Sequence, residues 1–257
     1  MLTADLARDL CWGLDPAAFA VEGLNFTPDP WQAQALRWEG RRLLLNVCRQ
    51  AGKSTTAAVL GLHTALYHPG ALVLLVSPSL RQSSELFRKV ADHLEALKVK
   101  PALLEDNRLS LQLANRSRIV SLPSTEATVR GFSGATLIIE DEASRVNDEL
   151  HQAVRPMLAV SGGRLILMST PWGKRGHFFQ AWSEGTEYER IQIKAPECAR
   201  IPALFLEEEG RAMPPWVFAQ EYMCSFEDAE DSVFTHGFIE ALHDDSIQPL
   251  FIAKEHP

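Results

Sequence analysis

The sequence predicts an α/β fold with a mostly parallel central β-sheet flanked by helices on both faces. Four apolar runs have the length of buried strands, and they occupy residues 41–47, 71–77, 135–140 and 163–169. Segments with helical character lie between them, and this alternation is typical of parallel sheets that are covered on both sides. The first and third runs also end in residues that are suited to binding phosphate and metal.

Local signals predict the remaining elements. Residues 1–25 are expected to form a helical lead-in, and residues 53–68 a helix that stops at Pro69. Residues 79–97 predict an amphipathic helix, because one stripe of apolar side chains recurs at helical spacing: Leu86, Val90, Leu94 and Leu97. Alternating polarity predicts a β-hairpin over residues 109–122. Further helices are expected at 147–158, 176–182, 202–209 and 214–224, and a further strand at 188–195.

Composition limits the class of protein. The 257 residues are 46% hydrophobic and 23% charged, as in a globular chain with an apolar core. No apolar run approaches the ~18 residues that a membrane-spanning helix needs, and the acidic start of the chain does not resemble a signal peptide. The four scattered cysteines fit a reducing cytoplasm, and neither they nor the histidines have the spacing of a metal site. The net charge of −8 argues against a surface that wraps nucleic acid broadly, although basic residues cluster between 81 and 118.

The stretch NVCRQAGKSTTAAVL, residues 46–60, resembles a nucleotide-binding loop with one departure. The usual pattern G-x-x-x-x-G-K-[ST] ends correctly at Gly52-Lys53-Ser54, but Val47 replaces its first glycine. A buried strand precedes the loop and a helix follows it, so backbone amides and the positive end of the helix would face an anion. Lys53 is suited to the β- and γ-phosphates of a nucleotide, and Ser54 is suited to Mg²⁺.

The run LIIEDEAS, residues 137–144, places carboxylates at the end of another buried strand. In a nucleotide triphosphatase, one such carboxylate holds the metal and its neighbour acts on the attacking water. We assign Asp141 to Mg²⁺ and Glu142 to catalysis. Three successive acids leave the register open, so Glu140 is an alternative metal ligand at this stage.

Three segments in this order, CRQAGKST, LIIEDEAS and LMSTPWG, resemble the ATPase domain of the large terminase subunit of tailed bacteriophages. That subunit is the motor that drives DNA into a preformed capsid. The family often lacks the first loop glycine and carries an arginine before Gln-x-Gly-Lys, where this chain has Arg49. The resemblance covers about residues 26–227 and implies a P-loop NTPase fold of the ASCE type.

The resemblance also implies roles for individual residues. Gln32 matches a segment that recognises adenine, with Gln34 as the alternative, and Arg49 would sense the γ-phosphate or stabilise its charge. Arg130 matches an arginine finger that reaches the active site of a neighbouring subunit. The expected residues are, for catalysis, Glu142, Arg130 and Arg49; for nucleotide binding, Gln32, Arg49, Gln50, Ala51, Gly52, Lys53, Ser54 and Thr55; for coupling of hydrolysis to movement, Ser169 and Thr170; and for Mg²⁺, Ser54 and Asp141.

The resemblance further implies an organisation and partners. Residues 1–227 would form the ATPase domain, and residues 228–257 a linker toward a nuclease domain that this chain does not include, so DNA cleavage is not expected of it. Expected partners are double-stranded DNA, the portal protein, the small terminase subunit and further copies in a homo-oligomeric, pentameric ring. The isolated domain is expected to be monomeric and not bound to membrane. Its expected location is the cytoplasm of an infected bacterium, docked on the procapsid portal during packaging.

Two other functions fit parts of this pattern. Helicase-type nucleic-acid translocases carry an upstream glutamine and an acidic strand end, but they normally need a second motor lobe, for which this chain has no room. A non-catalytic nucleotide-binding or assembly module would not need Lys53, Ser54, Asp141 and Glu142 together. The sequence therefore favours an ATP-hydrolysing motor domain.

Overall fold

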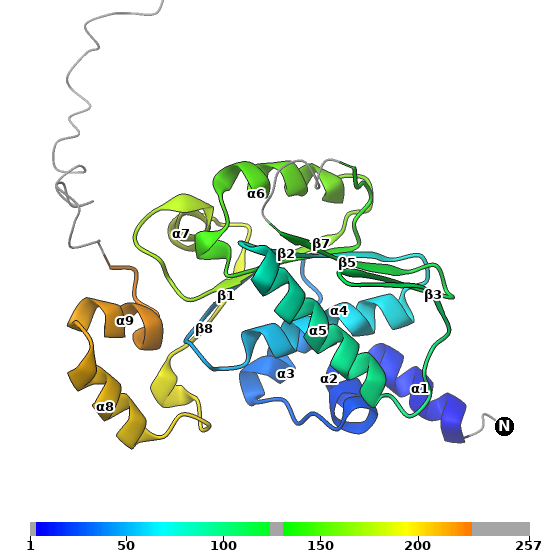
Figure 1. The fold of residues 1–257 in the computed structure, drawn as a ribbon, viewed down its shortest axis with the longest axis horizontal. Helices are drawn as coiled ribbons and strands as arrows, with labels where there is room; N and C mark the ends of the chain where they lie inside the picture. The colour runs from blue at the N-terminus through cyan, green and yellow to red at the C-terminus, as the bar shows by residue number, and fades with distance from the viewer. Residues whose placement is uncertain (1–3, 124–130, 228–257) are drawn as a thin grey trace, which may run out of the picture.

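A computed structural model describes residues 4–123 and 131–227 of the chain (Figure 1). The expected linker 228–257 and the expected finger Arg130 lie outside the described residues. The described part holds one eight-stranded sheet with the strand order β3-β4-β5-β2-β6-β7-β1-β8. Its strands are β1 (Arg42–Val47), β2 (Leu72–Ser77), β3 (Leu103–Asn107), β4 (Ser110–Leu113), β5 (Arg118–Pro123), β6 (Leu137–Asp141), β7 (Arg164–Ser169) and β8 (Glu189–Ile193).

The sheet is mostly parallel, as predicted. Strands β5, β2, β6, β7, β1 and β8 pair in parallel, and β3 and β4 add an antiparallel edge. Strand β7 lies between β1 and β6, so one strand separates the phosphate-loop strand from the acidic strand, as in ASCE-type P-loop folds. The sequence did not predict β3, because every residue of LLEDN is exposed there and no burial pattern marks it. Main-chain pairing with β4 forms this strand.

The helices cover both faces of the sheet (Figure 1). They are α1 (Ala4–Leu14), α2 (Pro16–Ala18), α3 (Pro30–Leu36), α4 (Lys53–Tyr67), α5 (Leu80–Ala96), α6 (Asp148–Val154), α7 (Gly176–Ser183), α8 (Ala203–Ala212) and α9 (Pro215–Met223). Helices α3, α4 and α5 pack on one face, α6 and α7 on the other, and α8 and α9 lie beyond β8. The helix predicted over 147–158 is α-helical only to Val154 and continues as a 3-10 turn, where Pro156 interrupts the helical hydrogen bonds.

The pleat of the central strands divides the core into two layers. In β6, Leu137 and Ile139 belong to the layer under α4 and α5, whereas Ile138 belongs to the layer under α6 and α7. Successive side chains of a strand point to opposite faces. Glu140 and Asp141, which end β6, therefore leave the sheet on opposite sides.

Gly163, where the chain enters β7, tests this packing. A Cβ atom there would lie 2.2 Å from the carbonyl oxygen of Ala135. Because the obstacle is backbone, we expect Gly163→Ala to lower the free energy of unfolding by about 1–3 kcal/mol in urea denaturation. Gly61→Ala is the matched control, since a Cβ in α4 would lie 3.5 Å from Cγ1 of Val73 and alanine favours a helix by about 1 kcal/mol over glycine. Equal losses in the two variants would contradict the predicted clash.

Candidate active site

The loop between β1 and α4 has its special backbone positions at Gln50 and Gly52. Their φ angles are +64° and +92°, in the left-handed region. A Cβ on Gly52 would lie 2.8 Å from Nε2 of Gln32, so glycine meets both a conformational and a steric need. Val47, which replaces the usual first glycine, is the last residue of β1, is fully buried and pairs with Ile193. The chain turns only after it, so this position needs no glycine.

Lys53 and Ser54 open helix α4 at the mouth of this loop. The Nζ atom of Lys53 donates to the carbonyl oxygens of Val47 and Cys48 at 3.0 and 3.2 Å, which holds the ammonium group inside the loop. The hydroxyl of Ser54 donates to Oδ2 of Asp141 at 3.0 Å. This contact joins the loop to the acidic strand, as the assignment of both residues to one metal requires. A hydroxyl and a carboxylate are the hard oxygen donors that Mg²⁺ prefers, so the two residues fit that ion.

Asp141 and Glu142 stand in different environments. Burial raises the pKa of Asp141, and the nearby charge of Glu142 raises it further, so the pair is poised to receive a cation. Glu142 follows the strand with φ +53°, an uncommon value for a non-glycine residue, and it is half-buried. This conformation carries its carboxylate beyond the end of the sheet toward Ser169, whose Oγ lies 3.5 Å from Oε2 of Glu142.

The expected coupling residues form part of the same constellation. Ser169 and Thr170 are buried at the end of β7. The hydroxyl of Ser144 lies 2.7 Å from that of Ser169 and donates to the carbonyl oxygen of Thr170 at 2.8 Å. The turn that follows Glu142 is thereby tied to the end of β7.

Glu140 is not a ligand at this edge of the site. It lies on the opposite face of β6 from Asp141, fully buried, and its two carboxylate oxygens contact His151 and His177. The sequence left it open as a metal partner of Ser54, and this alternative is wrong because the strand pleat sends successive side chains to opposite faces. Burial alone would raise the pKa of Glu140, but the hydrogen bonds from both histidines hold it well below its ordinary range.

Gln32 is an internal bridge in this structure. It has no exposed surface; its Oε1 accepts from the backbone amide of Asp29 at 2.8 Å, and its Nε2 donates to Oγ1 of Thr56 at 3.0 Å. These bonds complete a capping box at the start of α3 and fasten it to the first turns of α4. Gln34 is exposed. Direct contact of either side chain with adenine stays a prediction.

Several residues near the loop escaped the sequence analysis. Arg200 donates through Nη2 to Oδ2 of Asp29 and to the carbonyl oxygen of Ala51, both at 2.6 Å. Glu221 of α9 accepts from Arg145 at 3.3 Å and lies 3.9 Å from Arg49. Neither spacing nor motif marks these residues, because their contacts arise only when the segment after β8 packs back against the loop.

The other loop residues follow the same arrangement. Arg49 is largely exposed, and its backbone amide donates to the carbonyl oxygen of Glu221 at 3.0 Å. Gln50 is exposed, Ala51 is buried and Thr55 is half-buried. The ammonium group of Lys89 in α5 donates to Oγ1 of Thr55 at 3.3 Å.

The sheet order, the lysine-serine loop after β1 and the acids after β6 define a P-loop NTPase domain of the ASCE type. Residues 44–238 match the family described as "Terminase large subunit, T4likevirus-type, N-terminal", and the chain belongs to this family. It is 27% identical over 258 residues to the large terminase subunit of Thermus virus P23-45, an alignment that covers 86% of this chain and 53% of that protein. The chain thus spans about half the length of this curated relative.

Solved structures share the fold. The ATPase domain of the Thermus phage P74-26 large terminase matches with a TM-score of 0.74 and 22% identity, over 83% of this chain and all of that one. The large terminase of bacteriophage HK97 matches with a TM-score of 0.67 and 15% identity, over 84% of this chain and 55% of that one. Among the described residues, no helix combines the length and apolar character that crossing a membrane requires.

Gln32 and Gln34 provide a test of the internal bridge. Gln32→Ala leaves the amide of Asp29 and the hydroxyl of Thr56 without their partner, so we expect the free energy of unfolding to fall by about 1–3 kcal/mol without nucleotide. Gln34→Ala, at an exposed position in the same helix, should change it by less than about 0.5 kcal/mol. Urea denaturation measures both, and ATP binding measured in parallel tests the adenine contact. A fully stable Gln32→Ala variant would refute the bridging role.

Proposed function

We propose that this chain is the ATP-hydrolysing domain of a motor that translocates viral double-stranded DNA into a procapsid. The observation that carries the proposal is the junction of loop and strand: Ser54 contacts Asp141, Lys53 lies beside it, and Glu142 follows at the strand end. Membership of the terminase family supports it. A large terminase from another thermophilic bacteriophage has been solved in complex with ADP, which supports the nucleotide class.

The chemistry follows from the position of each group. Mg²⁺, held by Ser54 and Asp141, would neutralise oxygens of the β- and γ-phosphates. Lys53 exchanges its carbonyl partners for these phosphates. Glu142 takes a proton from the attacking water, whose oxygen forms a bond to the γ-phosphorus while the bond to the bridging oxygen breaks. ADP and inorganic phosphate leave.

Two arginines would stabilise the charge that develops on the γ-phosphate. Arg49 is 63% exposed along its side chain and pairs only loosely with Glu221, so it is able to turn toward a nucleotide. Arg130 from a neighbouring subunit is the second arginine. Ser169 and Thr170 would transmit the loss of phosphate, because Ser144 ties the end of β7 to the turn after Glu142.

The whole-motor part of the proposal concerns partners and place. The motor would be a homo-oligomeric, pentameric ring docked on the portal protein of a procapsid in the host cytoplasm, and the small terminase subunit would deliver its DNA. ATP hydrolysis that duplex DNA stimulates without strand unwinding would support this function. Unwinding would favour a helicase-type translocase, and absence of any phosphate release, under the assembly conditions described below, would favour a non-catalytic module.

Substitution of the two acids separates their roles. Glu142→Gln keeps the shape of the side chain and removes the base, so it should bind ATP with Mg²⁺ and hydrolyse it roughly 10²–10⁴-fold more slowly. Asp141→Asn weakens the hold on the metal, so its defect should shrink as the Mg²⁺ concentration rises. Phosphate release across a Mg²⁺ titration measures both, with Lys53→Ala as a folded, inactive control. Near-normal turnover of Glu142→Gln would overturn the assignment of the base.

Mixing of inactive variants tests Arg130. A finger from a neighbour contributes on the order of 10³–10⁵ in rate in other phosphoryl-transfer systems, so the dilute domain should be a poor ATPase that gains activity on assembly. Arg130→Ala keeps its own base, and Glu142→Ala keeps its arginine. A mixed ring should therefore recover part of the activity that each variant lacks alone. A finger that acts within its own subunit gives no recovery, and normal turnover of assembled Arg130→Ala excludes the role.

A further inference from the structure

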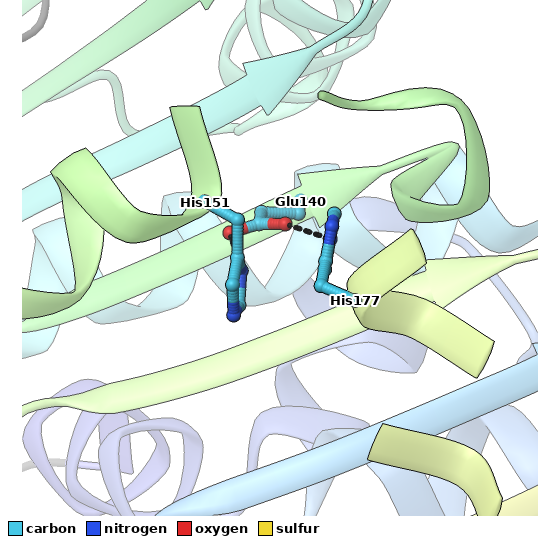
Figure 2. Close-up of side chains that lie close together, drawn as sticks. All are labelled: Glu140, His151 and His177. Atoms are coloured by element: carbon cyan, nitrogen blue, oxygen red, sulfur yellow. Dashed lines mark hydrogen bonds and ion pairs between the residues drawn. The ribbon is translucent and has the colours of Figure 1, made fainter. Parts of the chain in front are cut away.

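A second cluster of functional side chains lies on the far face of β6 from the nucleotide site. Glu140, His151 of α6 and His177 of α7 converge there, as Figure 2 shows. Nδ1 of His151 lies 2.8 Å from Oε1 of Glu140, and Nε2 of His177 lies 3.0 Å from Oε2. One ligand atom from each of the three residues lies within 4.8 Å of the other two, and all three side chains are buried.

The second nitrogen of His177 is also held. Its Nδ1 lies 3.0 Å from Oδ1 of Asp148, and the same oxygen accepts the backbone amide of His177 at 2.9 Å. Histidines that bind metals usually donate their other ring nitrogen to a carboxylate, which fixes the ring and makes the free nitrogen a stronger ligand. The order Asp148, His177, Glu140 reproduces such a carboxylate–histidine arrangement, with Nε2 aimed at the centre of the cluster.

The cluster borders a cavity. About 310 Å³ of open space is lined by residues of α6, of α7 and of the chain that follows α7, and Asp148, His151 and His177 are among them. This space gives an ion a route to the buried ligands and room for a water molecule beside it. The two rings stack with centroids 4.0 Å apart and planes 10° apart, so a modest tilt of each ring is enough to point both nitrogens at one ion.

We propose that Glu140, His151 and His177 bind one divalent transition-metal ion of the zinc class, with water from the cavity as a further ligand. Two imidazole nitrogens and one carboxylate form a donor set that suits Zn²⁺ and does not suit Mg²⁺, which prefers oxygen ligands only. The ion would replace the protons that now link each ring to Glu140. The site is distinct from the predicted Mg²⁺ site, since the two lie on opposite faces of the sheet.

The bound ion would fasten three elements together. Glu140 immediately precedes Asp141, and the two histidines come from the helices that cover this face of the sheet. A metal at this point would therefore stabilise the end of β6 and the register of the catalytic acids. The sequence analysis found no metal spacing among the histidines, because His151 and His177 lie 26 positions apart in the chain and meet only through the packing of α6 and α7.

Cobalt and zinc titrations of the full chain test the proposal. The chain carries Cys11→Ser, because this exposed thiol could bind metal by itself, and it is first stripped of metal with a chelator. We expect one Co²⁺ per chain with visible absorption bands of a four- or five-coordinate site, displacement of Co²⁺ by Zn²⁺, and a rise of the thermal midpoint with Zn²⁺ but not with Mg²⁺. The absence of stoichiometric Co²⁺ or Zn²⁺ binding would overturn the proposal.

Variants assign the ligands. His177→Gln and His151→Gln should lose the Co²⁺ bands and the Zn²⁺-dependent rise of the thermal midpoint. Asp148→Asn leaves all three ligands in place and should weaken binding by about 10–100-fold, as loss of a supporting carboxylate does. Because Asp148 is exposed, this variant should fold even if the buried substitutions do not. His68→Gln, at an exposed histidine, is the control, and binding that survives in both ligand variants or is unaffected by Asp148→Asn contradicts the site.

Discussion

The alternation of side chains at the end of β6 is the constraint on which the rest of the structure depends. Three acids follow one another in the sequence, yet the pleat allows only one of the first two to face helix α4. Asp141 takes that side and accepts from Ser54, while Glu140 takes the other and contacts two histidines. One strand end therefore supports two separate polar clusters without mutual interference, and a shift by one residue would exchange them.

Glu142 belongs to neither face, because the strand ends before it. Its left-handed backbone conformation turns the chain out of the sheet, and conformations of this kind are uncommon for a residue with a side chain. The hydroxyls of Ser144 and Ser169 lie around the turn and connect it to the neighbouring strand β7. The base is thus placed by a local distortion that two adjacent strand ends stabilise, and the distortion leaves its carboxylate beyond the sheet.

The sequence predicted what depends on local pattern and missed what depends on packing at a distance. Buried runs located all the parallel strands, and the loop motif located Lys53 and Ser54, since both signals are written in consecutive residues. It missed β3, which has no buried face, and it could not tell which acid faces the loop. Gln32 was predicted to meet a ligand and instead bridges α3 and α4, because a polar side chain without exposed surface looks the same in sequence as an exposed one. Arg200, Glu221 and the cluster of Glu140 with two histidines required the folded chain.

The two cations of the loop differ in how they are held, and this difference orders their roles. Lys53 is 7% exposed and bonded to two carbonyl groups, so its charge is already placed in the loop before a nucleotide arrives. Arg49 is on the surface at 3.9 Å from Glu221, a type of pair that contributes roughly 0–1 kcal/mol. The arginine therefore changes partner at little cost, whereas the lysine moves only if another anion satisfies it. Glu221 also accepts from Arg145, whose guanidinium lies 4.0 Å from the centre of the Trp172 ring. Release of Arg49 would leave α9 attached to the turn after the catalytic acid and to the segment after β7, so these three parts would respond together.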